Sequence, residues 1–276
     1  MTFGARLQEA VRARGRFCVG IDPHPELLRA WALPDDPAGL ERFARTVVEA
    51  VGREVAVLKP QAAFFERHGS RGVAVLERTI AAAREAGALV LLDAKRGDIG
   101  STMQAYADAY VDPSSPLAAD AVTAVPYAGY ESLRPLLDTA LAHGNGVFVV
   151  ALTSDRHGEE VQRARTAAGG TVAEVILGHV RDENAAAGGS AGAPGSVGCV
   201  VGATIRSSGY DLDVGGPLLA PGIGAQGAGP DDLRRVFGPA LPAVLPSSSR
   251  EILRHGPDTQ ALRAATLRAV RVFALP

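Results

Sequence analysis

The stretch Leu91–Thr102, LLDAKRGDIGST, passes from apolar residues into a group of charged and small polar ones. The apolar run that leads into it, residues 88–92, predicts a buried strand. Side chains two residues apart on a strand point to the same face, so Asp93 and Lys95 should lie side by side. Asp98 is expected to begin the next helix. Charges brought this close at a buried strand must be paired, which indicates either a functional site or a structural salt bridge beside a helix cap.

The same alternation of apolar strand and amphipathic helix runs through the whole chain. Strands are predicted over residues 17–22, 55–59, 88–92, 121–125, 146–154, 197–203, 217–220 and 242–245. Helices are predicted over residues 3–14, 40–51, 70–86, 130–143, 171–180, 231–237 and 258–272. Residues 155–170 are expected to form a long loop and residues 185–195 a flexible connection. Eight strands alternating with helices, without a break, predict an α/β fold: one (β/α)8 TIM barrel domain over residues 1–276.

The functional residues of such a barrel lie at the carboxyl ends of its strands. Seven polar or glycine positions fall at or just after the predicted strand ends: Asp22, Lys59, Asp93, Lys95, Ser154, Gly222 and Arg250. Their gathering on one rim indicates a site rather than a scatter of surface residues.

Lysine is almost absent from this chain. Of 28 basic residues only Lys59 and Lys95 are lysines, as a codon bias toward arginine would produce. A lysine that survives such a bias marks a place where arginine does not serve, because an ammonium is compact and gives up a proton when desolvated. Both lysines stand at predicted strand ends and are therefore candidate site residues.

The composition is ordinary for a soluble protein, with 276 residues, 47% hydrophobic, 21% charged and a formal net charge of −2. This balance argues against broad binding to nucleic acid or to an anionic membrane. No apolar run could cross a bilayer, and the first residues lack a secretory pattern. Cys18 and Cys199 lie in apolar runs, as small core residues do, and the six histidines show no metal-ligand spacing. We expect a cytoplasmic protein with no metal centre.

Two loops near the end of the chain have the composition of a phosphate site. Residues 221–227, PGIGAQG, contain G-x-G-x-x-G, but they follow the seventh strand and so do not fit a dinucleotide fingerprint. A backbone nest for phosphate is the better interpretation, since barrels commonly bind phosphate after strands seven and eight. The eighth strand leads into Ser247–Arg250, which offers hydroxyls and a guanidinium. The alternative is two flexible turns with a surface arginine.

Together these motifs resemble orotidine 5′-phosphate decarboxylase, above all its bacterial branch with the signature Asp-x-Lys-Arg-x-Asp-Ile-x-x-Thr. The signature residues here are Asp93, Lys95, Arg96, Asp98, Ile99 and Thr102. Further similar segments are Val19–Pro25, Lys59–Gln61, Leu152–Ser154, Ala220–Gly227 and Ser247–Arg250. The resemblance covers nearly the whole predicted barrel, and the combination is far more specific than D-x-K-x-x-D alone.

The resemblance implies decarboxylation of orotidine 5′-phosphate to UMP, the final step of de novo pyrimidine synthesis, with no cofactor. Lys59, Asp93, Lys95 and Asp98 would form an alternating charged array. Lys95 would stabilise the carbanion left by CO₂ and then donate a proton to it, which arginine could not readily do. Asp93 would oppose the substrate carboxylate and so favour the transition state over the bound substrate.

The resemblance also implies how the substrate is held. Asp22 and Lys59 would bind ribose hydroxyls, and Ser154 the pyrimidine. Gln226 would span pyrimidine and phosphate. The phosphate would lie on Arg250 and on the loop with Gly222 and Gly224. Asp98, Ile99 and Thr102 would reach into the neighbouring subunit's site, which makes a homodimer the functional form.

Three other functions remain open. Metal-dependent sugar-phosphate lyases of the same superfamily, such as hexulose-phosphate synthase, resemble one another in placing a carboxylate for Mg²⁺ where this chain has Lys59. A non-catalytic nucleotide-binding barrel would not need a proton donor beside Asp93. A Schiff-base aldolase would need an uncharged Lys95, whereas neighbouring carboxylates favour the charged amine.

Overall fold

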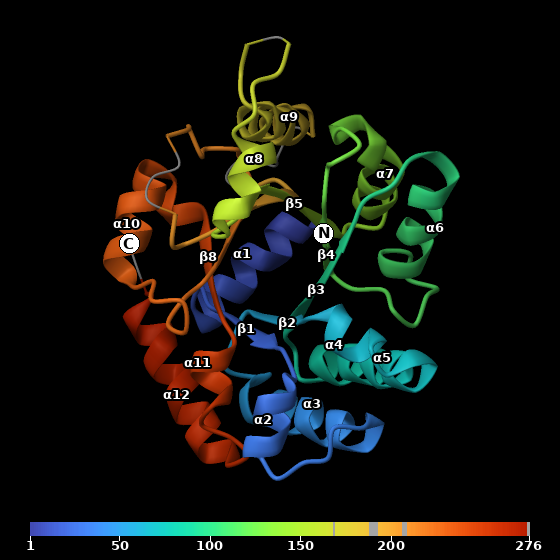
Figure 1. Ribbon diagram of the computed structural model, residues 1–276, viewed down its shortest axis with the longest axis vertical. Coiled ribbons are helices and arrows are strands. Elements are labelled where there is room, and N and C mark those ends of the chain that lie inside the picture. Colours follow the sequence, from blue (N-terminus) through green and yellow to red (C-terminus); the bar gives the residue numbers. More distant parts are fainter. Residues whose placement is uncertain (168, 188–192, 206–208, 275–276) are drawn as a thin grey trace.

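Eight parallel strands form a closed barrel, and this barrel lies at the centre of the molecule in the computed structural model (Figure 1). The structure describes residues 1–167, 169–187, 193–205 and 209–274. The strands are β1 (Cys18–Ile21), β2 (Val57–Pro60), β3 (Leu89–Arg96), β4 (Ala121–Ala124), β5 (Gly146–Leu152), β6 (Val197–Val201), β7 (Leu218–Pro221) and β8 (Val244–Ser248). They pair in chain order, and β8 pairs with β1, where Cys18 lies opposite Ser247. The predicted (β/α)8 TIM barrel is confirmed.

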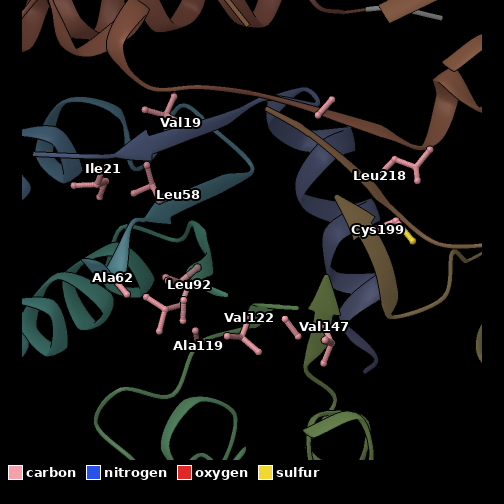
Figure 2. Packing of buried hydrophobic residues seen from close by; sticks show 14 of the residues in the cluster. Val19, Ile21, Leu58, Ala62, Leu92, Ala119, Val122, Val147, Cys199 and Leu218 are labelled. Atoms are coloured by element: carbon pink, nitrogen blue, oxygen red, sulfur yellow. The ribbon is translucent and has the colours of Figure 1, made fainter. Parts of the chain in front are cut away.

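Helices surround this barrel. The longer ones are α1 (Phe3–Arg14), α3 (Pro37–Val51), α5 (Gly69–Glu85), α6 (Gly100–Tyr110), α7 (Arg134–Ala142), α9 (Val172–Ala186), α10 (Pro230–Phe237) and α12 (Thr259–Val272). One large buried cluster joins all of these helices except α1 to the strands: Val47 of α3 and Ile80 of α5 belong to it together with Leu58 and Leu92, which Figure 2 shows on β2 and β3. No helix in the described ranges is long and apolar enough to span a membrane.

A second apolar cluster fills the inside of the barrel near the amino ends of the strands. It combines Cys18 and Val57, which begin β1 and β2, with Phe3 and Leu7 of α1. The ring of Phe3 meets that of Phe148 edge-on, with centroids 6.0 Å apart. Helix α1 thus covers the amino-terminal end of the barrel. The carboxyl ends of the strands form the other mouth, where the candidate site was predicted.

Several element boundaries differ from the prediction. Strand β3 continues to Arg96, and the next helix, α6, begins at Gly100 rather than at Asp98. The eighth strand begins at Val244, because the Pro242 segment forms the 3-10 helix η3 (Gly238–Ala243). Residues 130–143 divide into the 3-10 helix η1 (Tyr130–Leu133) and α7.

Short helices account for the remaining differences. The helices α2 (Pro25–Ala30), α4 (Ala62–Glu66) and α11 (Arg250–Leu253) were not predicted, and the expected loop 155–170 contains η2 (Arg156–Gly158) and α8 (Glu159–Gln162). Helices this short do not show a helical repeat in the sequence. The capping box between Thr171 and Glu174 at the start of α9 is confirmed. Helix α9 runs on into the expected connection 185–195, of which residues 188–192 lie outside the described residues.

Candidate active site

One buried carboxylate, that of Asp93, receives hydrogen bonds from side chains of three neighbouring strands. Lys59 of β2 donates to Oδ2 at 2.9 Å, and Lys95 of β3 donates to Oδ1 at 2.5 Å. The hydroxyl of Thr123, on β4, also donates to Oδ1, at 2.9 Å. The only two lysines of the sequence therefore meet on a single carboxylate, at the carboxyl ends of β2 and β3.

An irregularity in β3 produces this arrangement. Leu92 pairs with Val122 and Arg96 with Ala124, so the three residues between Leu92 and Arg96 face the single residue between their partners, Thr123. Lys95 adopts the left-handed conformation, with φ 49°, and its backbone N–H donates to the Thr123 hydroxyl at 2.9 Å. The sequence predicted that Asp93 and Lys95 share a face because the strand is regular. They do meet, but through a bulge.

The charges of this group stabilise one another. Burial alone would raise the pKa of Asp93, but the ammoniums of Lys59 and Lys95 outweigh it and hold that pKa well below the ordinary range. Burial alone would lower the pKa of Lys59, but the carboxylates of Asp93 and Asp22 raise it above its ordinary value. Asp93 and Lys59 therefore remain charged at neutral pH although both are buried.

The carboxylate and its partners form one wall of a cavity of about 210 Å³. Its other walls are mostly apolar or hydroxyl-bearing and include Val150, Thr153, Ser154, Val200 and Leu219, with Asp155 as a further acidic residue. A second cavity of about 360 Å³ lies beside it and is lined by Asp22, His24, Phe64, Gly222 and Ser247–Arg250, among others. Lys59, Pro221 and Gln226 line both cavities. The residues predicted for the pyrimidine and for the phosphate thus lie in adjoining cavities, with Gln226 where they meet.

Two residues that line the larger cavity carry buried polar atoms that have no partner within the described ranges. Asp22 Oδ1 and Ser249 Oγ are buried and receive no hydrogen bond from the described chain. Both crowd Gly20, where a Cβ would lie 2.8 Å from Ser249 Cβ and 3.0 Å from Asp22 Oδ1. A side chain at position 20 would push them out of place.

The glycine loop differs from the predicted phosphate nest. Gly222 and Gly224 have positive φ angles of 110° and 72°. The N–H groups of Gly224, Ala225 and Gly227 donate to carbonyls within the loop, so these amides do not point at a ligand. Gly222 lines the larger cavity, but Gly224 is not among its lining residues, and a Cβ there would lie 2.6 Å from Glu251 Cγ. The loop therefore gives the wall its shape and packs at Gly224 against Glu251 of α11, and the predicted role of Gly224 in substrate binding stays a prediction.

Asp98, Ile99 and Thr102 do not line either cavity of their own chain. The Asp98 carboxylate accepts a hydrogen bond from the N–H of Ile99 at 2.8 Å, and the Ile99 side chain is 63% exposed. This placement leaves them available to a second subunit, and their predicted role there stays a prediction.

Three residues that support Asp93 and Lys95 were given no role from the sequence. Thr123 is a single polar residue in an apolar strand, which is the signal that could have found it. Gln61 follows Lys59 directly after the strand end, and its side-chain N–H donates to the backbone carbonyl of Asp93 at 3.2 Å. Arg96 fixes the end of β3: its guanidinium pairs with Glu66, donates to the Tyr110 hydroxyl at 2.9 Å and donates to the Ala94 carbonyl at 3.0 Å.

Residues 15–265 match the model of the orotidine 5′-phosphate decarboxylase / HUMPS family. The chain belongs to this family. It is 64% identical over 270 residues to orotidine 5′-phosphate decarboxylase of Salinispora arenicola (strain CNS-205), covering 98% of this chain and 96% of the relative. It is 60% identical over 264 residues to the same enzyme of Streptomyces coelicolor, covering 95% of this chain and 94% of the relative. The resemblance drawn from the sequence is confirmed, and the chain is an enzyme of the carboxy-lyase class.

Solved structures agree. A Streptomyces avermitilis ma-4680 protein described as an orotidine 5′-phosphate decarboxylase is 60% identical, with a TM-score of 0.95 over 99% of this chain and 94% of that one. The OMP decarboxylase of Leishmania donovani is 29% identical, with a TM-score of 0.77 over 99% of each chain. Within the described ranges, no three His, Cys, Asp or Glu side chains gather where they could hold a metal ion. That the enzyme needs no metal or cofactor stays a prediction.

Proposed function

We propose that this enzyme converts orotidine 5′-phosphate to UMP without a cofactor, in the last step of pyrimidine nucleotide synthesis. The observation that carries the proposal is the Asp93 carboxylate, buried at the carboxyl mouth of the barrel between the ammoniums of Lys59 and Lys95. Family membership and relatives named for this activity support it.

The chemistry follows from the charges around Asp93. Loss of CO₂ leaves an electron pair on a ring carbon that has no adjacent group to delocalise it. The Lys95 ammonium stabilises that charge and then gives the carbon its proton, so the amine ends neutral and UMP is released. Asp93 stays ionised because its pKa is held low, and it repels the substrate carboxylate until that group leaves as neutral CO₂.

The other residues that line the two cavities are proposed to bind the substrate. Asp22 and Lys59 hold the ribose, Ser154 the pyrimidine, and Gln226 reaches both pyrimidine and phosphate. Arg250 clamps the phosphate beside Gly222. The position of Gln226 and Lys59 on both cavities supports this division, since a nucleotide would extend from one cavity into the other.

The functional form is proposed to be a homodimer in which Asp98, Ile99 and Thr102 complete the neighbouring site. The 63% exposure of Ile99 supports this proposal, because it leaves the side chain free to contact a second subunit. We further propose a single barrel domain over residues 1–276, and a cytoplasmic location, for which the free, buried thiols of Cys18 and Cys199 are the support.

A metal-dependent sugar-phosphate lyase is the second candidate. It is disfavoured because the Lys59 ammonium lies 2.9 Å from Asp93, so a divalent cation on this carboxylate would have to displace a buried ammonium.

The test follows the consumption of orotidine 5′-phosphate by its ultraviolet absorbance, in excess EDTA. It compares the wild type with Lys95→Ala and Lys95→Arg. We expect wild-type turnover and a loss on the order of 10⁴-fold in Lys95→Ala. Lys95→Arg keeps a cation beside Asp93 but cannot readily donate a proton, so most activity should still be lost. Activity that appears only with Mg²⁺ and a sugar phosphate would support the lyase. Tight UMP binding without any turnover would instead support a non-catalytic nucleotide-binding barrel.

The shared site is tested by mixing two inactive variants, Lys95→Ala and Asp98→Ala, after subunit exchange. If each site takes Lys95 from one chain and Asp98 from the other, a mixed dimer has one intact site, and about a quarter of wild-type activity should return. A mixture that stays inactive, although an affinity tag on one variant recovers the other, would place Asp98 outside the neighbouring site.

A further inference from the structure

Thr123 is the single residue of β4 that faces the bulge in β3. The inference about its role rests on the proposed function. We propose that the Thr123 hydroxyl is a positioning group, which fixes the Asp93 carboxylate and the Lys95 backbone so that Asp93 cannot turn away from the substrate carboxylate.

The Thr123 hydroxyl acts both as a donor and as an acceptor, toward Asp93 and Lys95 respectively. Its Oγ1 donates to Asp93 Oδ1 and accepts from the backbone N–H of Lys95, each at 2.9 Å. A hydroxyl has one proton to donate, so its orientation is set by this pair. Thr123 is 1% exposed and lies within β4, one of the barrel strands. It therefore connects the carboxylate to the backbone that carries the Lys95 side chain.

The other two partners of Asp93 are less able to hold it still. Lys59 and Lys95 have long, flexible side chains, and in the proposed reaction each also interacts with the substrate. A carboxylate bound only to them could follow them as they shift. Threonine is branched at Cβ and has a single side-chain torsion between backbone and hydroxyl, so it is stiff. Being uncharged, it restrains Asp93 without cancelling the repulsion on which the reaction depends.

The backbone at Lys95 also needs support. A residue with a Cβ is held in the left-handed region, here at φ 49°, only where its surroundings fix it. The N–H bond to Thr123 holds the residue itself, and Arg96 anchors the next one through Glu66, Tyr110 and the Ala94 carbonyl. Loss of the hydroxyl removes the contact that acts on both Lys95 and Asp93.

The experiment compares Thr123→Val, which keeps the shape and loses the hydroxyl, with Thr123→Ser, which keeps the hydroxyl. We expect kcat to fall about 100-fold in Thr123→Val, with KM for orotidine 5′-phosphate unchanged or lower, because Asp93 can relax away from the substrate carboxylate. Inhibition by UMP, which has no such carboxylate, should change less than about 2-fold. Thr123→Ser should keep most of the wild-type kcat.

Wild-type turnover in EDTA is measured in the same series, so failure of the proposed function would be seen separately as an inactive wild type. The positioning role is overturned if Thr123→Val keeps kcat within about 3-fold of wild type. It is also overturned if Val and Ser lose activity equally, or if KM and the UMP inhibition constant rise together. Should Thr123→Val fail to fold, Thr123→Ala provides the same comparison with Thr123→Ser.

Discussion

The two adjoining cavities differ in how complete they are before a substrate binds. At the reaction end, Asp93 already has hydrogen bonds from Lys59, Lys95 and Thr123. At the phosphate end, the larger cavity that is proposed to hold ribose and phosphate, Asp22 Oδ1 and Ser249 Oγ are buried without a hydrogen bond from the described chain. Charges that are fixed in advance cost no rearrangement at the moment of reaction. Buried polar groups without partners cost free energy that a bound nucleotide can recover, so the two ends suit chemistry and binding respectively.

The largest effect is expected from Asp93→Asn, which breaks the reaction end. Both Lys59 and Lys95 would lose the carboxylate that lies within 2.9 Å of them. Activity should disappear, and the free energy of unfolding should fall by about 3 kcal/mol, because a buried ammonium is left without its partner. Urea denaturation measures this. The control is Asp231→Asn, whose carboxylate is exposed and pairs with Arg234 at the surface, and it should change stability little. Equal stability of both variants would show that the array is not a stabilising unit.

The next prediction concerns how the difference in unfolding free energy between the wild type and Asp93→Asn depends on pH. Since the folded-state pKa of Asp93 is lowered, its contribution is complete above the unfolded pKa of about 4 and is lost as pH falls toward the folded value. The folded-state pKa of Lys59 is raised, so its contribution is complete below about 10.4 and is lost as pH rises further. The stability difference between wild type and Asp93→Asn should therefore be constant between about pH 5 and 9 and shrink below about pH 4. A difference that already falls at pH 6 would mean that Asp93 binds a proton near neutrality.

A smaller effect is expected at the phosphate end, from Arg250→Ala. Arg250 lines the larger cavity. Charge-assisted hydrogen bonds to phosphate contribute about 1.5–3 kcal/mol, so kcat/KM should fall roughly 10- to 100-fold. The same variant should act on orotidine, which lacks the phosphate, as the wild type does. Arg254→Ala is the matched control, because that arginine pairs with Glu251 at the surface. An equal loss with orotidine would assign Arg250 a role other than phosphate binding.

The fold and most of the reaction end could be predicted because each depends on local features of the sequence. Eight apolar runs, all but the sixth followed by a predicted helix, indicate a barrel without any knowledge of how it closes. The scarcity of lysine indicated Lys59 and Lys95 without any knowledge of their contacts. Helices such as α4 and α11 were missed because they are too short to show a period.

What could not be predicted depends on neighbours that are distant in the sequence. The bulge in β3 is defined only by its register with β4, so neither the left-handed Lys95 nor the role of Thr123 could be read from the residues alone. The glycine loop had the composition of a phosphate nest, but the hydrogen bonds within it engage the Gly224 amide with a carbonyl. Composition indicated that the loop turns sharply and did not reveal where its N–H groups point.

The smallest effect, and the sharpest test of an incomplete phosphate end, comes from two adjacent serines. Ser249 Oγ is buried without a partner in the described chain, whereas Ser248 Oγ donates to the Ile223 carbonyl at 3.0 Å. Ser248→Ala should lower the free energy of unfolding by about 1 kcal/mol, since it removes a buried hydrogen bond. Ser249→Ala should leave stability unchanged or slightly higher, yet raise KM for orotidine 5′-phosphate about 2- to 10-fold, because the hydroxyl gains its partner only from the ligand. Ser249→Ala could instead destabilise the free enzyme as much as Ser248→Ala does. The Ser249 hydroxyl would then already have a hydrogen-bond partner before the substrate binds, and the two cavities would be equally complete.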